Sequence, residues 1–105
     1  MKTVSVTTAT VVSASHPLRA DELARACGAD LAWVVQLVEI GILEAPAARQ
    51  DEWRFHSSDL GRAREARRLQ RDFDASLDAA ALILDMSAEL RRLRTQLRTL
   101  GFERP

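Results

Sequence analysis

The sequence predicts a mainly α-helical fold, in which a helix-turn-helix is followed by a short hairpin wing and a long C-terminal dimerisation helix. Two short helical segments, 18–26 and 30–40, flank a turn that contains Gly28, and this arrangement is typical of a helix-turn-helix. Segment 53–55, "WRF", alternates between apolar and basic residues as a half-buried strand does. Leucines then recur every three or four residues toward the C-terminus. We therefore place a winged helix-turn-helix domain at residues 1–73 and a dimerisation helix with its tail at residues 74–105.

The first domain begins with a segment that favours a strand. Residues 3–12, "TVSVTTATVV", are rich in Val and Thr, and Pro17 ends the strand because proline cannot donate to a ladder. The first helix follows over 18–26. Asp30 is suited to accept hydrogen bonds from the free N–H groups that begin the second helix, and Gly41 stands where a left-handed residue commonly ends one.

The third helix is expected over 59–71, after the strand of the wing and a group of capping residues at 56–59. Its inner face is apolar and its outer face is rich in arginine. We expect a break within 72–76, because Asp and Ser form local side-chain bonds that compete with a helix. The predicted inner residues are Leu60, Ala63, Ala66, Leu69 and, at the end, Phe73; the outer ones are Arg62, Arg64, Arg68 and Arg71.

The last helix is expected from residue 76 to residue 100, with Gly101 ending it. It carries an apolar stripe with the alternating spacing of three and four residues that coiled coils use. We interpret this stripe as a self-association seam, and packing against the chain's own domain is the alternative. The seam residues are Ile83, Met86, Leu90, Leu93, Leu97 and Leu100.

A second stripe of the last helix is acidic and lies next to the seam. Residues three or four apart share a helix face, and five residues at that spacing form this stripe: Asp74, Asp78, Leu82, Asp85 and Glu89. The plain interpretation is a solvated face. The functional interpretation is a negative strip that binds a basic partner surface, since opposite potentials steer association.

Composition and charge narrow the function classes. The chain has 15 basic and 15 acidic residues among 105, whereas DNA-binding domains usually carry a clear basic excess. The single cysteine, Cys27, excludes an internal disulfide. We find no catalytic constellation, no metal-ligand spacing and no phosphate-binding loop, so we expect neither an enzyme nor a cofactor. With no membrane-spanning run and no signal-peptide pattern, we expect a cytoplasmic protein.

The second helix, within "DLAWVVQLVEIGIL" at 30–43, has few groups that could contact a base edge. Valines and leucines fill its middle, so we expect much of it to be core. The two tryptophans, Trp33 and Trp53, are expected to pack in the core or wing, although the outer edge of this helix should include Trp33 with Gln36 and Glu39.

The order of these elements resembles the MerR superfamily of winged helix-turn-helix proteins. "IGIL" at 40–43 is similar to the exit from their second helix, and "WRFHSSDL" at 53–60 is similar to their wing and third-helix start, with one residue fewer before the second aromatic. The Arg-Tyr-Tyr-Glu-like run of DNA-binding members is replaced here by Val-Gln-Leu-Val at 35–38. The apolar second helix and the tail "LILDMSAELRRLRTQL" resemble a subfamily with that loss, the chaperone-modulator proteins (CbpM).

That resemblance implies a non-enzymatic homodimer that binds the J-domain of a DnaJ-like, CbpA-type co-chaperone and inhibits its co-chaperone activity. Inhibition of the partner's DNA binding stays open, as does an association with the nucleoid through that partner. J-domains present a basic helix to their Hsp70 partner, and we predict that the acidic stripe binds this helix. The alternative is a DNA-binding regulator of the MerR type, with Arg54, Arg62 and Arg64 at the phosphates. A toxin-neutralising or phage-type adaptor is a third hypothesis.

Overall fold

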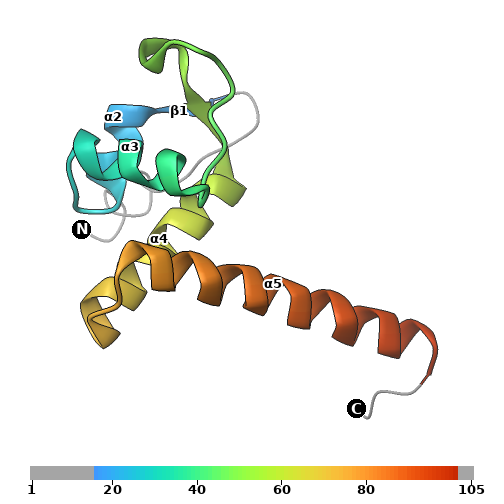
Figure 1. The fold of residues 1–105 in the computed structure, drawn as a ribbon. Helices are drawn as coiled ribbons and strands as arrows, with labels where there is room; N and C mark the ends of the chain where they lie inside the picture. Colours follow the sequence, from blue (N-terminus) through green and yellow to red (C-terminus); the bar gives the residue numbers. More distant parts are fainter. Residues whose placement is uncertain (1–15, 102–105) are drawn as a thin grey trace, which may run out of the picture.

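A computed structural model describes residues 16–101 of the chain, and Figure 1 draws its ribbon. The elements are β1 (Leu18–Arg19), α2 (Ala20–Ala26), α3 (Leu31–Ile40), a 3₁₀ turn η1 (Gln50–Glu52), β2 (Arg54–Phe55), α4 (Ser57–Phe73) and α5 (Leu77–Thr99). The mainly α-helical fold that the sequence predicts is therefore confirmed. The strand predicted at 3–12 lies outside the described residues.

The strand of the wing finds its partner far away in the sequence. β2 pairs antiparallel with β1, so that Leu18 lies opposite Phe55 and Arg19 opposite Arg54. The prediction that residues 18 and 19 belong to the first helix is wrong. Arg19 has an extended backbone and its N–H donates to Glu22 Oε1 at 2.8 Å. The helix therefore starts at Ala20, two residues after the predicted start.

Both ends of α3 form as the sequence predicts. Asp30 Oδ1 accepts the N–H of Trp33 at 3.0 Å, which satisfies one of the free donors of the first turn. Gly41 has a left-handed backbone with φ of 95°, and the N–H groups of Gly41 and Ile42 both donate to Leu37 O. This arrangement closes the helix and directs Ile42 and Leu43 into the core.

Gly41 offers a stability prediction with a matched control. Gly41→Ala should destabilise the chain by about 1–2 kcal/mol, because a Cβ strains a left-handed residue. Gly61→Ala should instead stabilise it by up to about 1 kcal/mol, because Gly61 lies inside α4 with open space around it. Urea unfolding of both variants measures the difference. Equal midpoints for the two would contradict the assigned role of Gly41.

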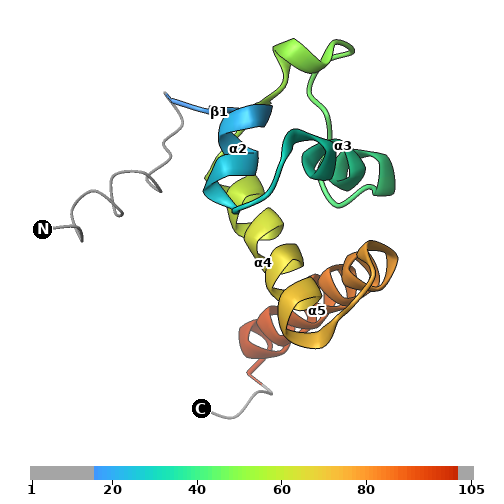
Figure 2. The ribbon, with the colours of Figure 1, turned by 90° about the vertical axis from the view of Figure 1, so that its left-hand side faces the viewer.

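The break between α4 and α5 is confirmed. Asp74 ends α4 in a left-handed conformation with φ of 56°, and Ser76 Oγ accepts the N–H of Ala79 at 3.1 Å to begin α5. α4 extends two residues beyond the predicted helix at each end. The corner lets α5 fold back across α4, which is visible in Figures 1 and 2.

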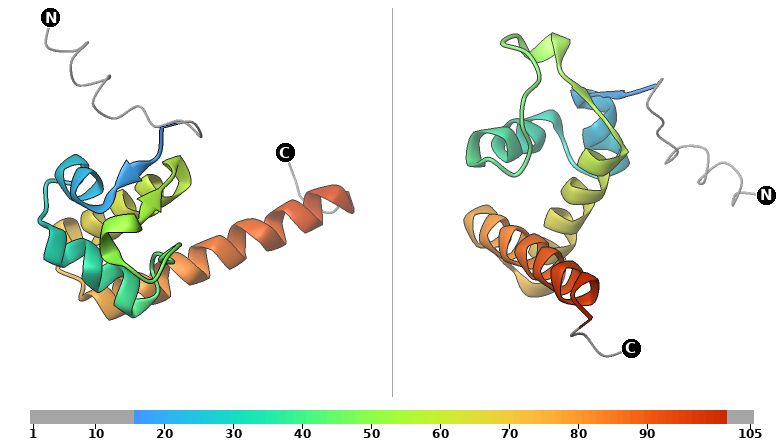
Figure 3. Two further views of the ribbon diagram at one scale, coloured as in Figure 1. Left: turned by 90° about the horizontal axis from the view of Figure 1, so that it is seen from above. Right: turned by 90° about the vertical axis from the view of Figure 1, so that its right-hand side faces the viewer.

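One core joins the helix-turn-helix, the wing and the first half of α5. It contains Phe55, Leu23, Leu37 and Val34 at its centre, together with the predicted inner residues Leu60, Ala63, Ala66 and Leu69 of α4. Phe73 is not among them, because 68% of it is exposed. α5 contributes only Ala80 and Leu84 as buried residues, and every residue from 88 to 100 is exposed. The second half of α5 therefore projects from the body, as Figure 3 shows.

Candidate protein-binding site

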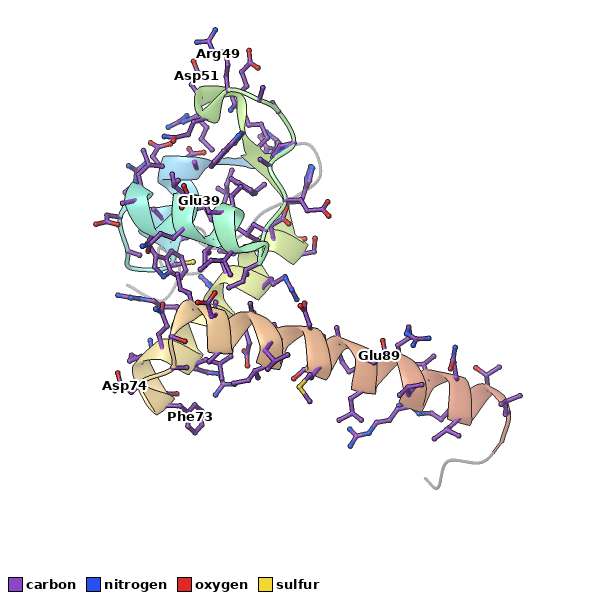
Figure 4. All side chains as sticks on the ribbon, viewed as in Figure 1. Glu39, Arg49, Asp51, Phe73, Asp74 and Glu89 are labelled. Carbon is purple, nitrogen blue, oxygen red and sulfur yellow. The ribbon has the colours of Figure 1, made fainter. Side chains whose placement is uncertain are left out.

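α3 is held by α4 through its own tryptophan. Trp33 is buried, its indole Nε1–H donates to Gln70 Oε1 at 2.8 Å, and the Arg67 guanidinium lies 5.8 Å from its ring centre. The packing predicted for Trp33 is confirmed, whereas its predicted place on the outer edge is wrong. Gln36 and Glu39 are exposed as predicted, and Glu39 points outward in Figure 4. The exposed polar residues of α3 are therefore Gln36 and Glu39.

Trp53 is the packing residue of the wing. It meets Phe55 edge-on, with ring centres 6.1 Å apart, and its indole N–H donates to Ala47 O at 2.9 Å. The wing is thereby tied to the loop that follows α3.

Arg62 is a structural link, and its predicted place on the outer face is wrong. Its Nε donates to Ile42 O at 2.6 Å and a terminal nitrogen donates to Asp85 Oδ1 at 2.7 Å. It therefore joins the exit of α3 to α5. These bonds hold the guanidinium of Arg62 against Ile42 O and Asp85, so it is less available for phosphate contacts than an exposed arginine.

Several other arginines of α4 are also engaged. Arg67 donates to Gly28 O, Arg68 pairs with Glu65 and Asp72, and Arg71 pairs with Asp72. The hydrogen bond from Arg68 lowers the pKa of the Glu65 carboxyl. Three arginines of the block at 62–71, namely Arg62, Arg68 and Arg71, thus pair with a carboxylate.

Two of the arginines proposed for DNA contact lie on the surface. Arg54 donates to the carbonyl oxygens of Asp51 and Trp53, at 3.1 Å and 2.8 Å, and Arg64 is exposed on α4. Two exposed acidic residues, Asp51 and Glu52 of η1, come shortly before the wing strand β2. Figure 4 labels Asp51 beside Arg49, with which it pairs at 2.7 Å.

The acidic strip of α5 consists of Asp78, Leu82, Asp85 and Glu89, which the helix places on one exposed face. The placement of Asp74 on this face is wrong. Asp74 ends α4 with a left-handed backbone before α5 begins, and Figure 4 shows it at the corner beside Phe73. The strip therefore has three carboxylates and one exposed leucine.

The carboxylates of the strip differ in their surroundings. Asp85 is held by Arg62, and Glu89 pairs with Arg92 on the next turn, whose hydrogen bond lowers the pKa of the Glu89 carboxyl. Within residues 16–101, Asp78 has no ion-pair partner, and it lies in the first turn of α5, where a negative charge is favourable. Asp78 is thus the member most available to another molecule.

The apolar stripe of α5 is exposed along its whole length. The exposed fractions of its members range from 40% at Ile83 to 67% at Leu100. Contiguous apolar surface of this kind on a small protein usually marks an interaction site. The remaining members are Met86, Leu90, Leu93 and Leu97.

Residues 16–101 were compared with the requirements of a metal site and of a membrane-spanning helix. Across residues 16–101 no group of three or more His, Cys, Asp or Glu side chains is placed to hold a metal ion. Cys27 is half-buried, and burial raises the pKa of its thiol. None of the helices in this range is both long and apolar enough to span a bilayer.

Comparison with known proteins identifies the family. The model of the family described as "MerR HTH family regulatory protein" matches residues 18–101, which covers every element from β1 to the end of α5. The chain belongs to this MerR family. The fold and the predicted superfamily resemblance are thereby confirmed.

Within the MerR family, the chain is similar to proteins called "Chaperone modulatory protein CbpM". One from Coxiella burnetii (strain Dugway 5J108-111) is 29% identical over 90 residues, which is 86% of this chain and 85% of the relative. One from Pseudomonas putida (strain W619) is 31% identical over 64 residues, or 61% of this chain and 63% of the relative. These similarities confirm the subfamily resemblance, and none of the descriptions names an enzyme. No solved structure matches the chain.

Two contacts that position α3, α4 and α5 in this MerR-family chain join residues far apart in the sequence. Trp33 and Gln70 lie 37 residues apart, and Arg62 and Asp85 lie 23 apart. Neither pair shares a helix face or a motif, so only the packing of α3, α4 and α5 brings them together. Helical spacing does not apply to Asp74, because a break separates it from α5.

Proposed function

We propose that this chain binds the J-domain of a DnaJ-like, CbpA-type co-chaperone and inhibits its co-chaperone activity. The observation that supports this proposal most is an exposed acidic strip on α5, in a chain similar to chaperone modulatory proteins. A J-domain presents a basic helix to its Hsp70 partner. A ligand that covers this helix would exclude Hsp70, and the strip has the opposite charge.

The binding site in this proposal is Asp78, Asp85 and Glu89 with Leu82 between them. Leu82 is 61% exposed, so it offers an apolar contact inside the charged strip. The carboxylates of the strip attract the basic helix of the J-domain and fix its register. Leu82 adds an apolar contact from which water is excluded. Because Arg62 already pairs with Asp85 and Arg92 pairs with Glu89, Asp78 contributes most of the free attraction.

The helix-turn-helix face supports a protein partner better than DNA. Its middle residues Val34 and Leu37 are buried, and its exposed edge carries Gln36 and Glu39. A carboxylate facing the phosphate backbone is repelled, and a single amide contacts few base edges. The surrounding acids outnumber the surrounding arginines in segment 16–56, where the acids are Asp21, Glu22, Asp30, Glu39, Glu44, Asp51 and Glu52 and the arginines are Arg19, Arg25, Arg49 and Arg54.

Self-association through the apolar stripe completes the proposal. In this proposal the protein is a cytoplasmic homodimer. The winged domain occupies residues 1–73, and the helix with its tail at residues 74–105 provides the self-association. Residues 77–90 of α5 contain acids and no base, whereas residues 91–99 contain four arginines, Arg91, Arg92, Arg94 and Arg98, and no acid. An antiparallel pair places the acidic half of each helix along the arginine half of the other, while a parallel pair places like charges together.

Calorimetric titration with a purified J-domain and a gel-shift assay with the chain's own upstream DNA separate the two candidate functions. We expect the J-domain to bind, with an affinity that falls as salt rises, and the DNA to show no shift that survives competitor. A specific shift that Arg54→Ala abolishes would favour the DNA-binding regulator. A J-domain that gives no heat and no complex would remove the proposed function.

A further inference from the structure

A hollow lined by arginines lies between α4 and the end of α2, and none of its lining residues belongs to α5. Its volume is about 320 Å³, and the end of α2 contributes Ala26 and the capping residue Cys27 to its wall. The remaining lining residues come from α4: Arg64, Glu65, Arg67, Arg68 and Arg71. This arginine hollow is therefore separate from the acidic strip and from the apolar stripe.

The spacing of the four arginines explains why they meet in one place. Residues three, four and seven apart share a helix face, and at about 100° per residue the four positions fall within an arc of about 100° around α4. Arg71 follows Arg64 by seven residues, which is about 10 Å along the helix axis. Burial raises the pKa of the Cys27 thiol, and the charges of Arg64 and Arg67 oppose that rise. Both guanidinium groups therefore lie close to the wall that α2 provides.

The arginines of the hollow outnumber the carboxylates that pair with them. Arg68 pairs with Glu65, and Arg71 pairs with Asp72. The other two arginines of the hollow have no ion pair within residues 16–101. Four guanidinium groups and two carboxylates leave two positive charges without a countercharge, so the hollow attracts anions.

Existing bonds position two of the guanidinium groups and leave most of their donors free. Arg67 uses a terminal nitrogen for Gly28 O at 3.2 Å, and Arg71 uses Nε for Asp72 Oδ1 at 3.3 Å. A guanidinium has five N–H donors, so each keeps several for a ligand. Side chains that are already positioned lose less conformational freedom on binding, which favours an anion in the hollow.

We propose that the arginine hollow binds the carboxylates of an acidic segment of a protein partner. Arginine is suited to this ligand, because its planar fork can hold a carboxylate by two parallel hydrogen bonds. The length over which the arginines are spread matches about three residues of an extended chain, at about 3.3 Å per residue. The hollow has the opposite charge to the acidic strip and lies on another helix, so it is a second binding site beyond the one proposed for the J-domain.

Duplex DNA is the less suitable occupant of this hollow. Proteins that bind a duplex commonly neutralise about six to ten phosphates, whereas four arginines gather here and two of them already pair with carboxylates. The chain as a whole has 15 basic and 15 acidic residues, so no general positive field extends the site. A short acidic segment matches both the size and the charge of the hollow.

Fluorescence anisotropy with a labelled oligoglutamate peptide tests the site. At low salt the natural chain should bind this peptide, and Arg64→Ala combined with Arg71→Ala should weaken the binding at least about fivefold. The matched control is Arg49→Ala combined with Arg94→Ala, which removes the same charge from two exposed positions outside the hollow. The control should bind within about twofold of the natural chain.

A lysine variant separates lost charge from altered folding. Arg64→Lys combined with Arg71→Lys keeps both positive charges, so it should bind the peptide within about threefold of the natural chain. The circular dichroism spectra of all variants should match. A natural chain that does not bind the peptide, or equal losses in the hollow variant and its control, would overturn the proposal. A mixed-sequence duplex that binds more tightly and displaces the peptide would also overturn it, in favour of nucleic acid.

Discussion

Leu93→Glu is expected to convert the dimer into a monomer at micromolar concentration. Leu93 lies at the centre of the stripe and is 43% exposed in the single chain, so pairing would bury it against a second copy. A carboxylate left there without a partner costs several kcal/mol, and we expect the dimer dissociation constant to rise at least about 100-fold.

The folded chain itself should tolerate this change. Every residue from 88 to 100 is exposed, so the monomer should keep its helical content by circular dichroism, and its urea midpoint should match that of the natural chain diluted below the dimer dissociation constant. Thr95→Glu is the matched control, because Thr95 lies on the opposite side of α5 and its hydroxyl donates only to Arg91 O. Sedimentation equilibrium distinguishes the two variants. An unchanged mass for Leu93→Glu would show that the stripe does not mediate association.

The second half of α5 projects from the folded body, so its apolar stripe is exposed in the single chain. A single α-helix of this length gains stability from packing one face. Within residues 16–101, the packed residues of α5 are the buried Ala80 and Leu84 with the partly buried Leu77 and Ala81. The apolar stripe itself, from Ile83 to Leu100, stays exposed in the part of the chain that the structure describes. A second copy is the simplest source of a packing partner, since it brings an identical stripe with complementary charges.

The sequence predicted the elements wherever local chemistry decides them. Asp30 and Gly41 bound α3 because a capping carboxylate and a left-handed glycine act within a few residues. The apolar positions of α4 from Leu60 to Leu69 are buried because helical periodicity selects one face.

Local patterns failed where a distant contact decides the outcome. Residues 18 and 19 are extended because Arg54 and Phe55 pair with them, and no nearby residue indicates this. The spacing of Arg62 indicates a surface arginine, yet it donates hydrogen bonds to Ile42 O after α3 and to Asp85 of α5. The candidate strip loses Asp74 for a related reason, since helical spacing holds only while the helix continues.

Charge reversal on the strip is the second large effect that we expect. Asp78→Lys combined with Glu89→Lys changes the two carboxylates that Arg62 does not hold, and leaves the Arg62–Asp85 link in place. Like charges would then face the basic helix of the J-domain. We expect affinity to fall at least about 30-fold, or about 2 kcal/mol, mainly through lost attraction and added repulsion.

A control with the same net charge keeps this result specific. Glu44→Lys combined with Glu52→Lys alters two exposed acids of the winged domain, away from α5. Both double variants should remain folded by circular dichroism, and each is titrated at a concentration at which sedimentation finds it dimeric.

Isothermal titration of the J-domain into the natural chain and these two double variants tests the central claim most directly. The account predicts binding by the natural chain and by Glu44→Lys/Glu52→Lys, and at least about a 30-fold loss for Asp78→Lys/Glu89→Lys. Equal affinity for all three would contradict the claim that the acidic strip of α5 binds the partner.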